Sequence, residues 1–327
     1  MSEFYPLMFS PIFKEKIWGG HKINTILGKD YGDLDNCGET WEISGVAGDV
    51  SIVSNGPLVG KPLDELVKKY KGRLVGNRVY DKYGDEFPLL VKFIDAAADL
   101  SIQVHPNDEL AQQRHGCRGK AEMWYMLQAD EGSSLISGFN CDLDKEAYLK
   151  ALQNGHLESV LNRESVKAGD VFYLPAGRVH TIGKGLLLAE IQETSDVTYR
   201  IYDFDRIDKD GSKRELHTEL ALDALDFKKQ KEYKTKYNKV ADKAVQLIEC
   251  SYFTTNKIEL KSSVIRVNDD LDSFLIYLCV DGEARVETKT GAVDLQKGQA
   301  CLVPAECTKE LKLITNSFGE LLESYIS

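Results

Sequence analysis

Short apolar runs alternate with turn residues along most of the chain. Gly, Asp, Asn and Pro bound runs rich in β-branched and aromatic residues: DVSIVS (49–54), PLLVKFIDA (88–96), LSIQVHP (100–106), DVFYLPAG (170–177), LLLAEIQET (186–194) and SFLIYLCV (273–280). Apolar runs of this length, separated by turn residues, are typical of the strands of β-sandwiches and barrels. The sequence therefore predicts a mainly β protein.

Helical periodicity is confined to a few segments. Segment 63–76 (LDELVKKYKGRLVG) places Leu63, Leu66, Val67, Tyr70 and Leu74 on one face. Segments 108–116 and 143–155 have shorter helical patterns, and each ends at a glycine. These patterns predict a few peripheral helices that cover the sheets.

A weak internal repeat divides the chain. The segment from Gly169 to Ala176 (GDVFYLPA) matches the segment from Gly298 to Ala305 (GQACLVPA) at an offset of 129 residues. The first copy continues to His180 and fits G-x5-P-x4-H, the form of the second motif of cupin barrels, whereas the second copy has Lys309 at that position. We predict two cupin-type β-sandwich or barrel (jelly-roll) lobes.

A polar, lysine-rich segment near residue 235 suggests where the two lobes meet. We expect residues 1–235 to form the catalytic, metal-binding cupin domain with its small helical elements. Residues 236–327 would form a degenerate cupin-like β domain, since that part of the chain contains no histidine.

Four residues could form a metal site. In an alternating strand, Gln103 and His105 project from the same face, and Glu122 and His180 would add a carboxylate and a second imidazole. Two His, one Glu and an amide oxygen without cysteine suit zinc with one open position, and iron, manganese and cobalt are also compatible. Taken alone, a histidine in an apolar strand is more often a hydrogen-bonded structural residue than a ligand. The joint pattern favours the metal site.

These motifs together resemble a known enzyme family. LSIQVHPND, GKAEMWY, the motif that ends at His180, AEIQETSDVTYRIYDFDR and the early IWGG occur in the order found in type I mannose-6-phosphate isomerases. Lys120-Ala121-Glu122 and the residues after Arg200 depart from the long members and resemble the short bacterial form.

The resemblance implies an enzyme that interconverts D-mannose 6-phosphate and D-fructose 6-phosphate through an enediolate, feeding mannose and GDP-mannose metabolism. It implies one divalent metal per chain, with zinc expected, held by Gln103, His105, Glu122 and His180, and an active-site arginine at Arg200. An arginine there can stabilise the enediolate as a fixed cation.

Further site residues follow from their positions beside these motifs. Lys120 is expected to bind phosphate or to join in proton transfer, although an exposed lysine is the simpler reading. Glu190 is a candidate base or a partner of a metal-bound histidine, with a structural ion pair as the alternative. Ser101 shares the face of Gln103 and is a candidate for substrate contact, and Trp18 is a candidate wall of the sugar pocket.

Composition narrows the possible partners. The net charge of −11 disfavours nucleic-acid binding, so a small sugar phosphate is the expected partner. No stretch approaches the length of a membrane span and the start of the chain lacks a signal pattern, so we expect a cytoplasmic protein with no membrane partner. Seven cysteines without C-x-x-C spacing indicate reduced thiols. The sequence does not indicate an oligomeric state.

Two other functions use the same residues. A cupin dioxygenase could hold Fe(II) in this ligand set, because imidazole and carboxylate also serve non-haem iron. A non-catalytic sugar-binding cupin is the third reading, although a complete metal shell beside Arg200 disfavours it.

Overall fold

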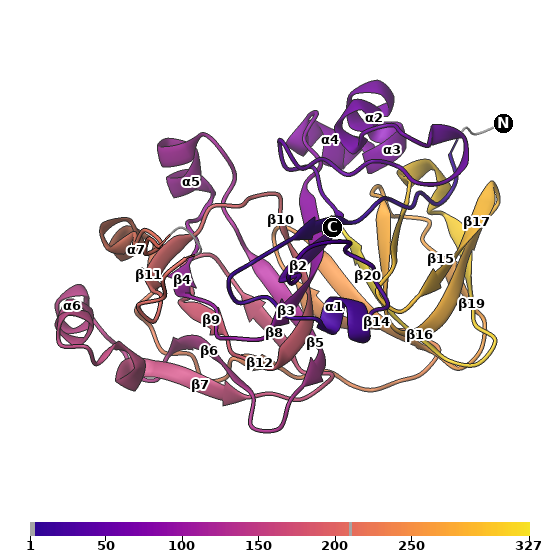
Figure 1. The fold of residues 1–327 in the computed structure, drawn as a ribbon. Coiled ribbons are helices and arrows are strands. Elements are labelled where there is room, and N and C mark those ends of the chain that lie inside the picture. The colour runs from indigo at the N-terminus through magenta and orange to yellow at the C-terminus, as the bar shows by residue number, and fades with distance from the viewer. Residues whose placement is uncertain (1–3, 209–210) are drawn as a thin grey trace.

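The computed structural model describes residues 4–208 and 211–327. Two β-rich lobes lie side by side, with helices at the periphery (Figure 1). The predicted mainly β fold is confirmed.

Two antiparallel sheets form the first lobe. The seven-stranded sheet has the order β1 (Ile12–Lys14), β2 (Glu39–Ile43), β3 (Leu89–Ala96), β10 (Leu186–Glu193), β5 (Glu122–Ala129), β8 (Val171–Leu174) and β12 (Lys234–Thr235). The five-stranded sheet has the order β11 (Tyr199–Tyr202), β4 (Ile102–Val104), β9 (His180–Ile182), β6 (Ser134–Phe139) and β7 (Leu161–Ser165). Side chains of both sheets share one buried cluster, as expected for two packed sheets.

The two central strands of the larger sheet are buried along their whole length. In β10, Leu186 and Leu188 face the cluster between the two sheets, whereas Leu187, Ala189 and Ile191 belong to a second core on the opposite face. A strand that is covered on both faces needs apolar residues at successive positions, which explains the continuous apolar runs in the sequence. A charged residue in such a strand must therefore have a buried partner.

The second lobe is a separate antiparallel sheet system. Its order is β13 (Ala244–Glu249), β14 (Thr254–Leu260), β20 (Gly319–Tyr325), β16 (Leu275–Thr288), β19 (Glu310–Ile314) and β15 (Val264–Val267), and β17 (Gly291–Gln296) and β18 (Ala300–Val303) also pair with β16. The long β16 holds this lobe together, because it pairs with four different strands.

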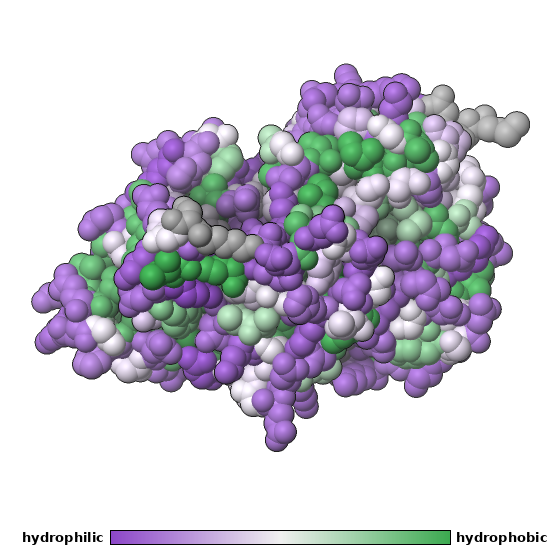
Figure 2. Space-filling view, in the orientation of Figure 1, coloured by the Kyte–Doolittle hydropathy of each residue, from purple (hydrophilic) through white to green (hydrophobic). Residues whose placement is uncertain are grey.

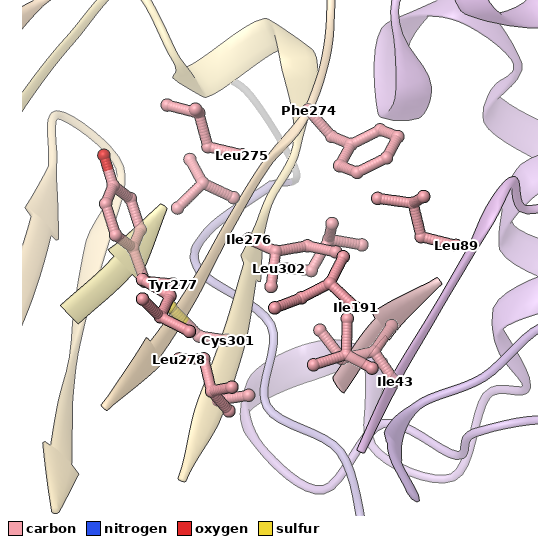
Figure 3. Close-up of a cluster of buried hydrophobic side chains, with 14 of the residues drawn as sticks. Ile43, Leu89, Ile191, Phe274, Leu275, Ile276, Tyr277, Leu278, Cys301 and Leu302 are labelled. Atoms are coloured by element: carbon pink, nitrogen blue, oxygen red, sulfur yellow. The ribbon is translucent and has the colours of Figure 1, made fainter. Parts of the chain in front are cut away.

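A continuous hydrophobic core joins the two lobes. Ile43, Leu89 and Ile191 of the first lobe face Phe274 and Leu302 of the second (Figure 3). Burial of this apolar surface is the main attraction between the lobes, at roughly 25 cal/mol per Å². The second lobe thus covers the outer face of the sheet whose inner face carries Glu122 and Glu190.

Helices lie around the sheets, mostly on the first lobe (Figure 1). They are α1 (Lys22–Thr25), α2 (Leu63–Tyr70), α3 (Gly72–Val75), α4 (Asn77–Tyr83), α5 (Asp108–His115), α6 (Lys145–Gln153) and α7 (Thr218–Ala224), with short 3-10 turns η1 (Gly56–Leu58), η2 (Leu157–Val160) and η3 (Ala305–Cys307). Asn107 and Asp144 cap α5 and α6 by accepting backbone N–H groups.

Two local predictions were wrong. The helical segment 63–76 breaks into α2 and α3, because Lys71 adopts a φ of 50° and ends the first helix. The run 49–54 forms no strand, and Ile52 and Val53 make only isolated bridges to Pro62 and Phe9. These residues pair with neighbouring loops instead of with a sheet.

The described surface carries mostly hydrophilic residues on the face shown in Figure 2. Among the described residues, no helix is both long enough and apolar enough to cross a membrane. All seven cysteines are free thiols, as the sequence indicated, and four of them are buried.

Candidate active site

Strands of both sheets of the first lobe bring the predicted ligands together. Gln103 of β4 lies directly opposite His180, the first residue of β9, and His105 follows the end of β4. Glu122 begins β5 in the facing sheet. Ligand atoms of His105, Glu122 and His180 all lie within 4.8 Å of one another, and the three side chains are buried. The structure therefore places all four predicted ligands in one cluster.

Backbone carbonyls determine the tautomer of both imidazoles. Nδ1 of His105 lies 2.9 Å from the Val197 carbonyl oxygen, and Nδ1 of His180 lies 2.8 Å from that of Arg178. A carbonyl oxygen can only accept a hydrogen bond, so each Nδ1 carries the proton and each Nε2 presents a lone pair. Both lone pairs are directed at the Glu122 carboxylate.

These acceptors face one another with no proton between them. Nε2 of His105 is 3.4 Å from one Glu122 oxygen, and Nε2 of His180 is 3.3 Å from the other. The Lys120 ammonium lies 3.1 Å from one Glu122 oxygen, whereas the other Glu122 oxygen and Nε2 of His105 have no hydrogen-bond partner among the described residues. Buried acceptors without donors are costly, so the cluster fits a cation at its centre.

The pKa values of these groups also suit a cation. Burial, together with the nearby Lys120 ammonium, lowers the pKa of His105 to about 3, and burial lowers the pKa of His180. Burial alone would raise the pKa of Glu122, but Lys120 and the two imidazoles outweigh it and keep this pKa well below its usual value. Near neutral pH the cluster thus offers two neutral imidazoles and one carboxylate.

The amide of Gln103 lies against the cluster with its nitrogen inward. Its Nε2 is 3.2 Å from Nε2 of His180, and its Oε1 accepts a hydrogen bond of 3.2 Å from Ser101. A half-turn of the terminal amide exchanges these nearly isosteric atoms and would direct the oxygen at the cluster. Gln103 is therefore in place as a fourth ligand, but only in that second orientation.

Lys120 is a buried residue of the site. It is only 4% exposed, and its ammonium lies 3.1 Å from a Glu122 oxygen. The simpler reading of Lys120 as a solvated surface lysine was therefore wrong. Burial of an ammonium is tolerated here because of the neighbouring carboxylate.

Glu190 forms a buried ion pair with a lysine that the sequence analysis missed. The ammonium of Lys92, from the adjacent strand β3, lies 2.9 Å from one Glu190 oxygen and 3.7 Å from Glu39. Trp124 donates a 2.7 Å hydrogen bond to the other Glu190 oxygen. Burial would lower the pKa of Lys92, but Glu190 and Glu39 outweigh it and raise this pKa, so Lys92 stays charged.

One cavity is bordered by Gln103, Lys120 and Glu190. It has a volume of about 260 Å³ and is lined by Trp18, Ser101, Gln103, Lys120, Glu190 and Arg200, together with Lys16, Glu39, Lys92, Ile94, Leu100, Ile182, Asp196, Thr198 and Arg214. Trp18 and Ser101 thus lie where substrate contact was predicted. Trp18 also packs in the core between the sheets, so this residue both lines the cavity and belongs to the core.

Arg200 approaches the cavity from the edge of the five-stranded sheet. It lies on β11 opposite Gln103, and its Nη1 donates a 2.8 Å hydrogen bond to the Glu215 carbonyl oxygen. Its Nε is buried and has no hydrogen-bond partner among the described residues. This guanidinium therefore has donor capacity left for a ligand in the cavity.

Several charged residues of the cavity were missing from the sequence predictions. Lys92 had a detectable signal, because it is a lysine in the middle of the apolar run 88–96. Glu39 also lies in a fully buried strand, β2. Lys16, Asp196 and Arg214 come from irregular segments, where no periodicity indicates the direction of a side chain.

Comparisons with known proteins agree with this site. Residues 7–137 match the family model described as phosphomannose isomerase type I, catalytic domain, and residues 243–325 match mannose-6-phosphate isomerase, cupin domain. Mannose-6-phosphate isomerase ManA of Bacillus subtilis is 37% identical over 305 residues, covering 91% of this chain and 93% of that protein. The enzyme of Streptococcus mutans is 36% identical over 300 residues, covering 91% and 92%.

A solved structure supports the same relationship. The crystal structure of the Bacillus subtilis mannose 6-phosphate isomerase has a TM-score of 0.87 to this chain at 32% identity, covering 98% of this chain and 99% of that one. Similarity thus extends over both lobes, beyond the motifs in the first two thirds of the sequence. The chain belongs to the type I mannose-6-phosphate isomerase (phosphomannose isomerase) family.

Proposed function

We propose that this protein is a metal-dependent aldose–ketose isomerase that interconverts D-mannose 6-phosphate and D-fructose 6-phosphate. The observation that carries the proposal is the buried cluster of His105, Glu122 and His180, whose ligand atoms converge beside a highly charged cavity that Gln103 and Lys120 line. Family membership supports the substrate.

The chemistry of the donor set fits one divalent cation. His105 and His180 would bind it through Nε2, Glu122 through its carboxylate, and Gln103 through its oxygen after the amide turns. We propose zinc, which favours mixed nitrogen and oxygen ligands with one open position. When bound, the ion supplies Lewis-acid polarisation of the substrate oxygens.

The remaining residues of the cavity provide charge stabilisation and proton transfer. Isomerisation moves a proton between C2 and C1 of the sugar while negative charge develops on the adjacent oxygen. Arg200 is assigned to stabilise that charge, because a guanidinium keeps its proton throughout. Lys120 is our first candidate for the proton carrier, since both oxygens of the alternative, Glu190, are already engaged by Lys92 and Trp124.

An anaerobic assay tests this function directly. Wild-type protein should convert mannose 6-phosphate to fructose 6-phosphate without oxygen, lose activity on chelation and regain it when zinc is added. Activity that required oxygen would favour a dioxygenase, and binding of sugar without turnover would favour a non-catalytic cupin. Either result would contradict the proposed isomerase.

We also propose that the chain divides near residue 235, with residues 236–327 as a lobe that binds no metal. Lys309 replaces the imidazole there. In the interior of this lobe, Glu323 accepts hydrogen bonds from Asn256, Arg266 and Tyr277. A carboxylate that is fully paired in this way has no acceptor left for a cation.

Zinc titration of the apo-protein should therefore give one tight equivalent per chain. Calorimetric titration of the wild type measures the stoichiometry, and Lys309→His should leave it at one, because a single imidazole cannot replace a ligand shell. The matched control is His180→Ala, which should abolish the tight equivalent. Two tight equivalents, one of them lost when Glu323 is replaced by Gln, would contradict the proposed division of roles.

A further inference from the structure

The segment that follows β11 returns along the outer edge of the five-stranded sheet and reaches the active-site cavity. The backbone N–H of His217 donates a 2.7 Å hydrogen bond to the Arg200 carbonyl oxygen, and the Arg200 side chain donates to the Glu215 carbonyl oxygen. These contacts fix residues 215–217 against β11, so Arg214 lines the cavity. Arg214 and Arg200 therefore line the same cavity.

Positive charge exceeds negative charge at this end of the cavity. Asp203 accepts hydrogen bonds from both Arg206 and Arg214 and is only 5% exposed. Arg200 adds a third guanidinium, and none of the described carboxylates forms a salt bridge with it. One buried carboxylate thus pairs with two of the three arginines, which leaves two positive charges to be balanced.

The other cations of the cavity already have partners. Lys16 lies 3.1 Å from Glu39, Lys92 pairs with Glu190, and Lys120 pairs with Glu122. Two further carboxylates near Arg200 and Arg214 are Asp196, which is exposed and lines the cavity, and Glu215, whose side chain is 85% exposed. Exposed carboxylates are largely screened by solvent and do little to balance the partly buried arginine charge.

Arg214 retains donors for a ligand. Its Nε and one Nη2 hydrogen face Asp203, with an Nε distance of 2.8 Å. A guanidinium has five N–H donors, so three remain, and two of them, one on Nη1 and one on Nη2, form the planar edge that matches two oxygens of a phosphate. The ion pair with Asp203 holds that edge in a fixed orientation.

The order of the strands places this edge at a suitable position. His180, Gln103 and Arg200 form a row across β9, β4 and β11. Neighbouring strands are about 4.8 Å apart, so the row extends roughly 10 Å from His180 to Arg200. Residues 215–217 lie along the outer edge of β11, and Arg214 lines the same cavity. A sugar phosphate whose reacting carbons lie beside His105, Glu122 and His180 would extend along this row.

We propose that Arg214 binds the phosphate group of the substrate and thereby sets the preference for phosphorylated over free sugars. This inference rests on the proposed function. Arg200 lies between the phosphate and the ligand cluster, and its assigned role remains that of stabilising the enediolate.

Arg206 provides a matched control, because it also pairs with Asp203 but does not line the cavity. Steady-state kinetics would compare wild type, Arg214→Gln and Arg206→Gln with mannose 6-phosphate as substrate and inorganic phosphate as competitive inhibitor. We expect Arg214→Gln to raise KM and the phosphate inhibition constant together by about 10- to 100-fold, as for loss of charge-assisted hydrogen bonds. Arg206→Gln should change either constant by less than about threefold, because Arg206 does not line the cavity in which the phosphate would bind.

The outcomes separate the two proposals. If the wild type does not isomerise mannose 6-phosphate, the proposed function fails. If the wild type is active and Arg214→Gln keeps the wild-type constants, or Arg206→Gln raises them equally, the phosphate inference alone is overturned.

Melting temperatures report whether each variant folds. If Arg214→Gln does not fold, Arg214→Lys replaces it. Loss of the planar fork should then raise both constants about three- to tenfold, and unchanged constants would overturn the inference.

Discussion

Replacing His105 or His180 by alanine is expected to remove the bound metal and to lower isomerase activity by at least about 10³-fold, while the protein stays folded. The large loss follows because polarisation by a bound ion contributes several kcal/mol to catalysis. The fold should survive because the two lobes are held by an apolar core to which neither histidine belongs. Elemental analysis measures the metal, an initial-rate assay the activity and thermal unfolding the fold.

An exposed histidine supplies the control. His156 lies on the surface just before η2, so His156→Ala should retain metal and activity. Each site variant also leaves one Glu122 oxygen without its imidazole neighbour, so addition of free imidazole could partly restore activity. Unchanged metal content in both His105→Ala and His180→Ala would refute the assigned metal site.

Strand periodicity made the clustering of the candidate ligands predictable. The alternation in LSIQVHP put Gln103 and His105 on one face, and the motif that ends at His180 put a second imidazole at a strand start. Both inferences need only local backbone geometry. The orientation of the Gln103 amide and the choice of imidazole tautomer depend on carbonyls of distant residues such as Val197, which no local pattern reveals.

The charged wall of the cavity was harder to predict, because its members meet only through pairing of distant strands. Lys92 and Glu190 are 98 positions apart in the chain and face each other through the register of β3 and β10. Arg214 depends on a return of the chain after β11 that is fixed by backbone contacts to Arg200. The break between α2 and α3 was unpredictable for a similar reason. The apolar residues follow one regular helical pattern, but the backbone conformation of Lys71 ends the first helix.

Arg200→Lys is expected to lower kcat by about 10² to 10³ with little change in KM. Losses of this size accompany removal of a donor that stabilises an oxyanion elsewhere. Lysine keeps the charge but lacks the planar guanidinium, whose Nε is buried and has no hydrogen-bond partner among the described residues. An interaction made chiefly in the transition state affects kcat, whereas one made equally in the ground state affects KM.

The contrast with Arg214 makes this prediction specific. Both guanidiniums line one cavity, and Arg200 lies on β11 opposite Gln103, whose amide contacts His180. Steady-state kinetics at saturating zinc should therefore show a kcat defect for Arg200→Lys and a KM defect for Arg214→Gln. Free guanidinium should raise kcat in Arg200→Ala, as expected if the missing group acts on the reacting atoms. Wild-type kcat in both Arg200→Lys and Arg200→Ala would exclude Arg200 from the mechanism. Equal KM defects in the Arg200 and Arg214 variants would instead assign both residues to substrate binding.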